Sequence, residues 1–310
     1  MTQIIAKLAE ISDNYDAVFC DLWGCLHNGV APFPDAVAAL QAFRAKGGRV
    51  ILLTNAPRPK SSIIKQLDGM AVPRDAWDDV VTSGDAAQYA MLTGAVGHKV
   101  HFIGAEKDEP FFTDFADDLK AVAASNPPIE RVATKDAEGL VVTGLADDLT
   151  ETPEDYRATL LLAKNLGLPM LCANPDIIVH WGDKLLYCAG ALAKMYEDMG
   201  GTALYFGKPH PPIYDLARRR LQAVAGADEA RIHAAFPRIW VTVSEGVSAP
   251  EGESAAHVPW EANIHANGQR LLDAPALYNL YEDQGVSLFQ EIVLVGATAG
   301  EAGVAYLALR

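Results

Sequence analysis

Three short segments of the chain carry side chains that together suit phosphoryl transfer. Asp21, the pair Thr54-Asn55 and Lys208 each come directly after, or at the end of, a short apolar run. A carboxylate can attack phosphorus to form an aspartyl-phosphate, while hydroxyl, backbone N–H and ammonium groups hold and neutralise the transferring oxygens. Because Asp and Asn are also ordinary turn residues, each segment alone is a weak signal. Their combination predicts a site with Asp21 as nucleophile.

Alternating strand and helix signals must position these side chains. Strands are predicted at 17–22, 49–54 and 79–82, and helices at 34–46 and 59–67. Such alternation predicts parallel βαβ units in an α/β fold with a doubly wound sheet. Ligands bind at the carboxyl ends of the strands in such sheets. We therefore expect Asp21, Thr54 and Lys208 to lie along one carboxyl edge of a single parallel sheet.

The middle of the chain predicts an inserted α/β cap at about 84–184, which leaves 1–83 and 185–310 as a discontinuous core domain. Strands are expected within the insert at 99–103, 139–143, 170–172 and 177–179, with a helix at 153–166. Beyond it, helices are expected at 189–199 and 271–284, and strands at 203–206, 238–243 and 291–295. The run Arg218–Arg220 is interpreted as a solvated helix face.

Composition limits the class of partner. The 310 residues have a net charge of −15, which argues against nucleic acid because phosphate backbones require a basic face. No apolar run approaches the ~18 residues that span a bilayer, so no membrane partner is expected. The N-terminus lacks a signal-peptide pattern, and the predicted compartment is the cytoplasm. The four cysteines form no C-x-x-C pair and are expected to be reduced.

Five motifs, in order, resemble the haloacid dehalogenase (HAD) superfamily of phosphatases, subclass IIA. The similarity is to the bacterial group whose first motif reads D-x-W-G-x-L-H-x-G. The matching segments are 21–29, 53–58, 82–85, 172–176 and 207–212. The resemblance implies a Rossmann-like core with a C2-type cap, Mg²⁺ as cofactor and a homodimer through the cap. The implied substrate is a small phosphorylated metabolite such as a sugar phosphate or pyridoxal phosphate.

The resemblance also assigns roles to individual residues. Asp21 would be the nucleophile and a Mg²⁺ ligand, with the backbone carbonyl of Trp23 as a second ligand. The phosphoryl group would be held by Thr54 and the Asn55 backbone and neutralised by Lys208. Asn174 and Asp176 would shape the substrate pocket.

Two departures from the family pattern bear on activity. Most HAD phosphatases carry an Asp two residues after the nucleophile, which protonates the leaving group, and here that residue is Trp23. His27 and Asp176 are alternative acids, and a structural role is the other interpretation of His27.

The fourth motif, aligned on the strand at 238–243, offers Glu245 for the first metal-binding Asp and Pro250 for the second. Glu245 is either the remaining Mg²⁺ ligand or a solvated loop residue. Two functions follow: a Mg²⁺-dependent phosphatase, or a catalytically impaired HAD-fold protein that binds a phosphorylated ligand.

Overall fold

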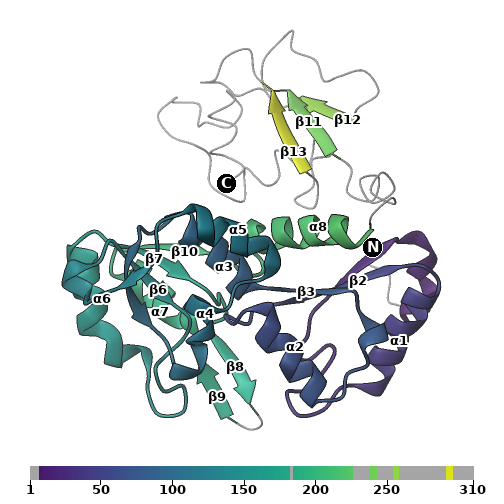
Figure 1. Cartoon of the computed structure of the whole chain (residues 1–310), viewed down its shortest axis with the longest axis horizontal. Coiled ribbons are helices and arrows are strands. Elements are labelled where there is room, and N and C mark those ends of the chain that lie inside the picture. Colours follow the sequence, from purple (N-terminus) through teal and green to yellow (C-terminus); the bar gives the residue numbers. More distant parts are fainter. Residues whose placement is uncertain (1–6, 182–183, 226–237, 243–253, 258–290, 296–310) are drawn as a thin grey trace. The chain divides into compact units, whose positions relative to one another are not determined.

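The computed structural model describes residues 7–181, 184–225, 238–242, 254–257 and 291–295, the last three as backbone strands. Contacts group the chain into two compact units, Met1–Gly226 and Ala227–Arg310 (Figure 1). In the described part of the chain, no helix is long and apolar enough to cross a membrane.

The first sheet of residues 1–226 has three parallel strands in the order β1-β2-β3. They are β1 (Ala17–Cys20), β2 (Arg49–Thr54) and β3 (Asp79–Thr82), connected through α1 (Pro34–Ala45) and α2 (Lys60–Gly69). Phe19 pairs with Ile51, and Leu52 pairs with Val80. The strands and helices predicted for this region are confirmed, although β1 ends at Cys20.

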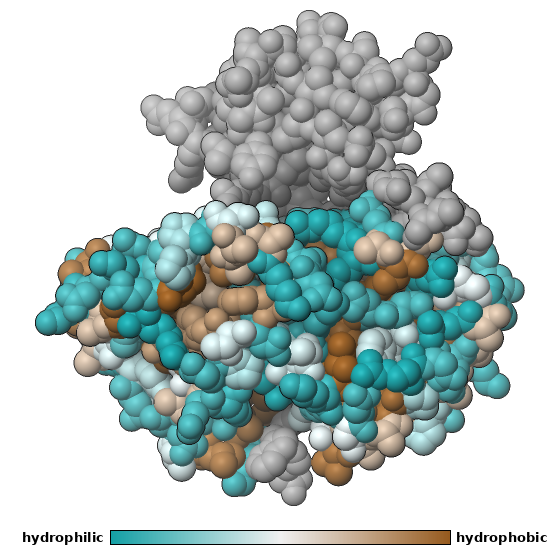
Figure 2. Space-filling model, viewed as in Figure 1, coloured by the Kyte–Doolittle hydropathy of each residue, from teal (hydrophilic) through white to brown (hydrophobic). Residues whose placement is uncertain are grey.

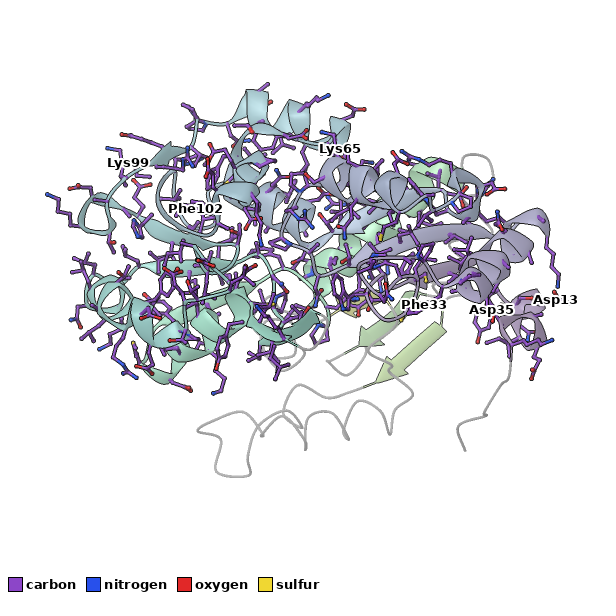
Figure 3. The ribbon with its side chains drawn as sticks, turned by 90° about the horizontal axis from the view of Figure 1, so that it is seen from below. Asp13, Phe33, Asp35, Lys65, Lys99 and Phe102 are labelled. Atoms are coloured by element: carbon purple, nitrogen blue, oxygen red, sulfur yellow. The ribbon has the colours of Figure 1, made fainter. Side chains whose placement is uncertain are left out.

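Successive side chains of the first sheet point to opposite faces, as a strand requires. Val50, Leu52 and Val80 are buried in one cluster with side chains of α1 and α2. On the other face lies α8 (Pro211–Ala225) (Figure 1). Burying each such side chain stabilises the fold by roughly 1.5–3 kcal/mol. The outer face of α2 carries exposed Lys65 (Figure 3).

The second sheet has five parallel strands in the order β10-β7-β6-β4-β5. They are β4 (Lys99–Ile103), β5 (Glu130–Arg131), β6 (Gly139–Val142), β7 (Pro169–Cys172) and β10 (Thr202–Tyr205). Their helices are α3 (Ser83–Leu92), α4 (Pro110–Thr113), α5 (Asp117–Ser125), α6 (Arg157–Asn165) and α7 (Ala189–Asp198). Because β10 pairs with β7, this sheet extends beyond residue 184, where the insert was expected to end. The division into core and cap stays a prediction.

A separate antiparallel hairpin joins the second sheet to α7. It consists of β8 (Ile178–Trp181) and β9 (Lys184–Tyr187), with Val179 paired to Leu186. Only its first strand was predicted. Short 3-10 turns complete the unit at Leu8–Glu10, Ser12–Asn14, Arg74–Ala76, Glu106–Asp108, Thr134–Asp136 and Pro153–Tyr156. Figure 2 shows a mostly hydrophilic surface on this face of residues 1–226, with scattered hydrophobic patches.

Residues 227–310 contain a parallel sheet in the order β12-β11-β13. Its strands are β11 (Arg238–Thr242), β12 (Ser254–His257) and β13 (Glu291–Val295). Two of these confirm the strands predicted at 238–243 and 291–295. The helix predicted at 271–284 and the predicted ligand Glu245 lie outside the described residues.

Candidate functional site

Asp21 and Lys208 form an ion pair, with 2.6 Å between Asp21 Oδ1 and Lys208 Nζ. Asp21 directly follows β1, where the Leu22 N–H donates to the same Oδ1 at 2.8 Å. Lys208 Nζ also donates to the Leu53 carbonyl oxygen at 3.2 Å. The ammonium group is therefore fixed between the ends of β1 and β2, and the second oxygen of Asp21 carries neither of these contacts.

Lys208 reaches this point from a different sheet than the sequence suggested. Asp21 and Thr54 end neighbouring strands of the first sheet, but Lys208 follows β10 of the second. The prediction that all three lie on one sheet edge is wrong, and the site is assembled from two sheets. Its residues nevertheless all follow carboxyl strand ends, which is where open α/β sheets bind ligands.

Asn55 fastens the Lys208 loop to the first sheet. Its Oδ1 accepts the Lys208 N–H at 2.6 Å, and its Nδ2 donates to the Lys208 carbonyl oxygen at 3.1 Å and to Asp176 Oδ1 at 2.9 Å. The Asp176 N–H in turn donates to Asn174 Oδ1 at 3.0 Å. The buried Asn55 side chain is thus committed to positioning, which leaves only its backbone for a ligand.

Close packing at Gly207 holds the same loop. A Cβ atom there would lie 2.6 Å from Asn55 Oδ1 and 2.7 Å from Ser83 Oγ. Both distances are too short for a real contact, so the backbone can approach only because residue 207 is glycine. The glycine therefore sets the position of Lys208.

Thr54 is buried at the end of β2. Its hydroxyl oxygen accepts the Ala56 N–H at 3.2 Å. A hydroxyl has one proton to donate as well as lone pairs to accept, so this hydrogen bond leaves the Thr54 proton available for donation.

The turn after Asp21 shapes the side of the site where Trp23 lies. Backbone N–H groups within this turn donate to the carbonyl oxygens of Leu22 and His27. Among the described residues, nothing donates to the Trp23 carbonyl oxygen. Trp23 is 39 % exposed, and its indole meets the His27 ring edge-to-face at 5.7 Å and packs against Gly29. One face of the indole is thus fixed and the rest remains open.

His27 is a structural element of this turn. The Gly29 N–H donates to His27 Nδ1 at 3.0 Å, so Nδ1 is unprotonated in this arrangement. Burial lowers the pKa of His27, although the Asp21 carboxylate opposes the shift. A neutral imidazole with a lowered pKa fits the structural interpretation better than that of a general acid.

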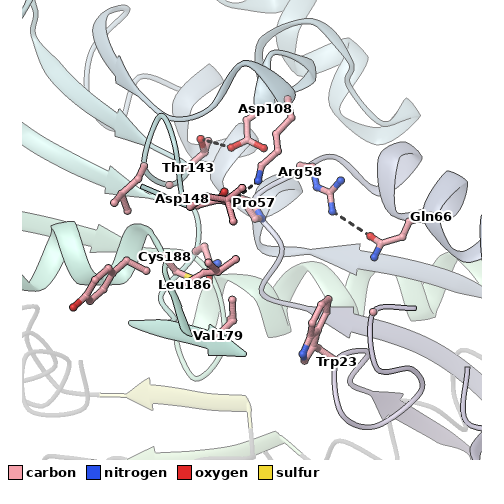
Figure 4. Close-up of a pocket in the computed structure, with 17 residues that line it drawn as sticks. Trp23, Pro57, Arg58, Gln66, Asp108, Thr143, Asp148, Val179, Leu186 and Cys188 are labelled. Atoms are coloured by element: carbon pink, nitrogen blue, oxygen red, sulfur yellow. Dashed lines mark hydrogen bonds and ion pairs between the residues drawn. The ribbon is translucent and has the colours of Figure 1, made fainter. Parts of the chain in front are cut away.

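A cavity of about 470 Å³ is lined by Trp23, two residues after Asp21, and by Arg58, four residues after Thr54 (Figure 4). Its lining includes Trp23 and Asn174 but neither Asp21 nor Lys208. The Asp21–Lys208 pair and the cavity are therefore separate features of the candidate site. Other lining residues are Arg58, Lys107, Asp108, Thr143, Leu145, Asp148, Val179 and Leu186. Of these, Arg58 lies in the motif at 53–58 but had no predicted role, and no strand was predicted at Leu186.

The described residues supply only part of a magnesium site. Asp21 and the Trp23 carbonyl offer oxygen atoms, the ligand type that Mg²⁺ prefers. Within the described ranges, no group of three or more His, Cys, Asp or Glu side chains is placed to bind a metal. The donors present fit Mg²⁺ in kind, but not in number.

The chain is similar to known proteins in sequence and in fold. Residues 18–116 match the family model described as haloacid dehalogenase-like hydrolase. A crystal structure of a hydrolase of the haloacid dehalogenase-like family from Brucella suis 1330 is 37% identical. That match covers 83% of this chain and 93% of the other, with a TM-score of 0.65. No curated protein sequence matches significantly.

More distant structures share the fold. Glycerol phosphate phosphatase from Mycobacterium tuberculosis, solved with magnesium, is 22% identical over 80% of this chain and 76% of its own, with a TM-score of 0.52. For 4-nitrophenylphosphatase from Thermotoga maritima, the identity is 20% over 78% and 90%, with a TM-score of 0.51.

Proposed function

The chain belongs to the haloacid dehalogenase-like hydrolase family, and we propose that it is a phosphatase that hydrolyses a small phosphorylated metabolite through an aspartyl-phosphate. The observation that supports this proposal most directly is the contact of 2.6 Å between Asp21 and Lys208. In this contact a carboxylate and a cation lie together after strand ends, which is the combination that nucleophilic attack on phosphorus requires.

The two oxygens of Asp21 have different roles in the proposed reaction. Oδ1 is held by Lys208 and by the Leu22 N–H, so Oδ2 attacks phosphorus. The ester P–O bond breaks, and its electron pair leaves with the substrate oxygen. Water then attacks the acyl phosphate, which releases phosphate and restores the carboxylate. Lys208, the Thr54 hydroxyl and the Asn55 backbone stabilise the charge of the transferring oxygens.

We further propose that Asp21 and the Trp23 carbonyl bind Mg²⁺. A bound Mg²⁺ would neutralise charge on the phosphoryl oxygens. Glu245 remains the predicted additional ligand. Sugar phosphates and pyridoxal phosphate remain the predicted substrates. His27 and Asp176 remain the alternative acids, although the hydrogen bond that His27 accepts favours its structural role.

Substitution of the nucleophile tests the proposal. In Asp21→Asn, hydrolysis of 4-nitrophenyl phosphate with Mg²⁺ should fall by about a thousandfold or more, because the amide cannot form the acyl phosphate. Asp13→Asn is the matched control, since Asp13 is an exposed carboxylate paired with Lys46, and it should retain full activity. Equal rates in wild type and Asp21→Asn would refute the assignment of Asp21 as the nucleophile.

The second candidate function is a binding protein without turnover. It is favoured by one observation, which is that Trp23 occupies the residue position where most of the family carry the acid. If wild type hydrolyses no ester of a metabolite panel yet binds inorganic phosphate in calorimetry, this second function replaces the first.

A further inference from the structure

The cavity beside the proposed phosphoryl centre is lined by a cation, Arg58, that has no carboxylate partner among the described residues. Among the described residues, no ion pair involves Arg58, and its guanidinium donates only to the neutral Gln66 side chain, at 3.1 Å. The other lining cation, Lys107, is neutralised by Asp148 at 2.5 Å. A half-buried guanidinium without a carboxylate partner is suited to bind an anion from outside the chain.

Asp108 lines the same cavity but forms no ion pair with Arg58 among the described residues. Asp108 is buried, and its carboxylate accepts the Thr143 hydroxyl at 2.9 Å. Burial raises the pKa of Asp108 in spite of that hydrogen bond and the attraction of nearby cations. Arg58 is one of those cations, so the two side chains attract each other without forming an ion pair, and the Asp108 carboxylate is committed to Thr143.

The backbone fixes Arg58 close to the phosphoryl centre. Arg58 lies in the loop between Thr54 and α2, and the Gly84 N–H donates to the Ala56 carbonyl oxygen of that loop at 3.0 Å. A Cβ on Gly84 would collide with the Pro57 and Arg58 carbonyl oxygens, so α3 packs directly against the loop. The backbone of Arg58 is thus held in place relative to Thr54 by a tightly packed segment.

Apolar side chains form the walls between these two charged points. In Figure 4, Trp23 lies on one side of the cavity, with Val179 and Leu186 on the other. Val179 and Leu186 are directly paired across the hairpin and so share one face. Between them and the immobilised indole, the space suits a flat apolar group.

Resting on the proposed phosphatase function, we propose that the substrate is a phosphate monoester whose leaving group has a flat apolar face and a second anionic group. The phosphate lies at Asp21 and Lys208, the flat group lies against Trp23, and the second anion binds Arg58. Arg58 is thus a specificity-determining residue. A carboxylate and a second phosphate both meet this requirement, because each is an anion that accepts hydrogen bonds from a guanidinium.

A matched pair of esters tests the second anion. 4-Carboxyphenyl phosphate and 4-carbamoylphenyl phosphate have the same shape and differ in one charge. Wild type should prefer the carboxylate in kcat/KM by about tenfold or more, the size expected for a hydrogen-bonded charge pair. In Arg58→Gln, the ratio should fall to about one. Lys65→Gln removes an exposed charge from the neighbouring α2 and should keep the wild-type ratio.

A binding measurement makes the test independent of turnover. Calorimetry should show that 4-carboxybenzylphosphonate binds wild type more tightly than benzylphosphonate does, and that Arg58→Gln removes this preference. Benzylphosphonate should also bind more weakly to Trp23→Leu. Equal binding of the two phosphonates by wild type, or a preference that survives Arg58→Gln, would overturn the inference. If neither ester is hydrolysed but the Arg58-dependent preference is found, the proposed function fails and the anion site stands.

Discussion

At the scale of single residues, the candidate site is built from one charged contact held by neutral hydrogen bonds. Lys208 contributes its ammonium group to Asp21 and its backbone N–H and carbonyl to Asn55. The chemical and structural roles of this residue are therefore separable, because a substitution removes the side chain and keeps the backbone.

Lys208→Met should lower kcat by about a hundred- to a thousandfold, the effect of losing one preorganised charge at a phosphoryl centre. Its melting temperature should stay close to that of wild type, because the Asn55 hydrogen bonds use backbone atoms. Steady-state kinetics and thermal unfolding of the same preparation check both expectations. A variant that loses activity only by unfolding would contradict the separation of roles.

His27 predicts a pH dependence of stability. Burial lowers its pKa below the unfolded value of about 6.5. The stabilisation from the neutral form is therefore complete above that value and is lost as the pH falls toward the lowered folded pKa. In His27→Asn, the amide oxygen replaces Nδ1 as acceptor and does not titrate in this range.

The difference in free energy of unfolding between wild type and His27→Asn should therefore shrink as the pH falls. It should be constant between pH values of about 7.5 and 8.5, and smaller at about 5.5. Urea unfolding across this range measures it. A difference that grows on acidification would mean that the folded protein favours the protonated imidazole.

At the scale of elements, close contacts between loops set the site. Gly207→Ala would force Cβ against Asn55 and Ser83, so the loop carrying Lys208 must move. We expect the free energy of unfolding to fall by about 1–3 kcal/mol, as at other overpacked sites. In proportion to the wild-type value, kcat/KM should fall by more than the free energy of unfolding does.

Gly69→Ala is the matched control for this change. A Cβ at Gly69 meets nothing within 4 Å, and alanine favours a helix by up to about 1 kcal/mol over glycine. This control should be as stable as wild type or more so, with unchanged kinetics. Equal behaviour of the two alanine variants would refute the packing argument.

The helix α8 is anchored by a buried ion pair. Arg220 on α8 is 4% exposed, pairs with Asp85 at the start of α3 and with Asp118 on α5, and donates to the Val80 carbonyl oxygen at 2.8 Å. Asp85 also accepts the Lys60 N–H at the start of α2, at 2.9 Å. The interpretation of Arg218–Arg220 as a solvated face is wrong for Arg220, because that residue lies under α3 and α5.

Arg220→Met should lower the free energy of unfolding by about 3–5 kcal/mol, because it leaves the Asp85 carboxylate buried without its cation. The double variant Asp85→Asn/Arg220→Met should recover part of that loss. Urea unfolding of the single and double variants measures the coupling. If the double variant is no more stable than Arg220→Met, the unpaired charge is not the cause.

At the scale of the whole molecule, the carboxyl ends of two sheets supply one site. Asp21 and Thr54 follow strands of the first sheet, whereas Asp108, Asn174 and Lys208 follow strands of the second. The chain carries a net charge of −15, so its overall charge repels the proposed phosphorylated substrate. Local cations must therefore dominate at the phosphoryl centre.

Removal of divalent cations should abolish the proposed phosphatase activity. We expect EDTA to stop hydrolysis of 4-nitrophenyl phosphate and excess Mg²⁺ to restore it, because Lys208 alone is one positive charge against a phosphate dianion. Glu245→Gln should raise the Mg²⁺ concentration that gives half-maximal activity. Full activity in EDTA would show that the lysine suffices and would remove Mg²⁺ from the proposal.

The sequence by itself determined most of the strands, the helices α1, α2, α6 and α7, and the candidate residues at strand ends, because strand periodicity and strand-end residues are local properties. It did not indicate β5, β9 and β12, or the helices α3, α4 and α5. Asp21 and Thr54 were indicated because each is a polar residue at the end of a predicted strand. Only the tertiary structure decided that Lys208 arrives from a second sheet, that the Asn55 side chain is committed to positioning, and that Arg58 has no carboxylate partner among the described residues. The physical reason is that these facts depend on contacts between segments far apart in the chain, which local patterns do not encode.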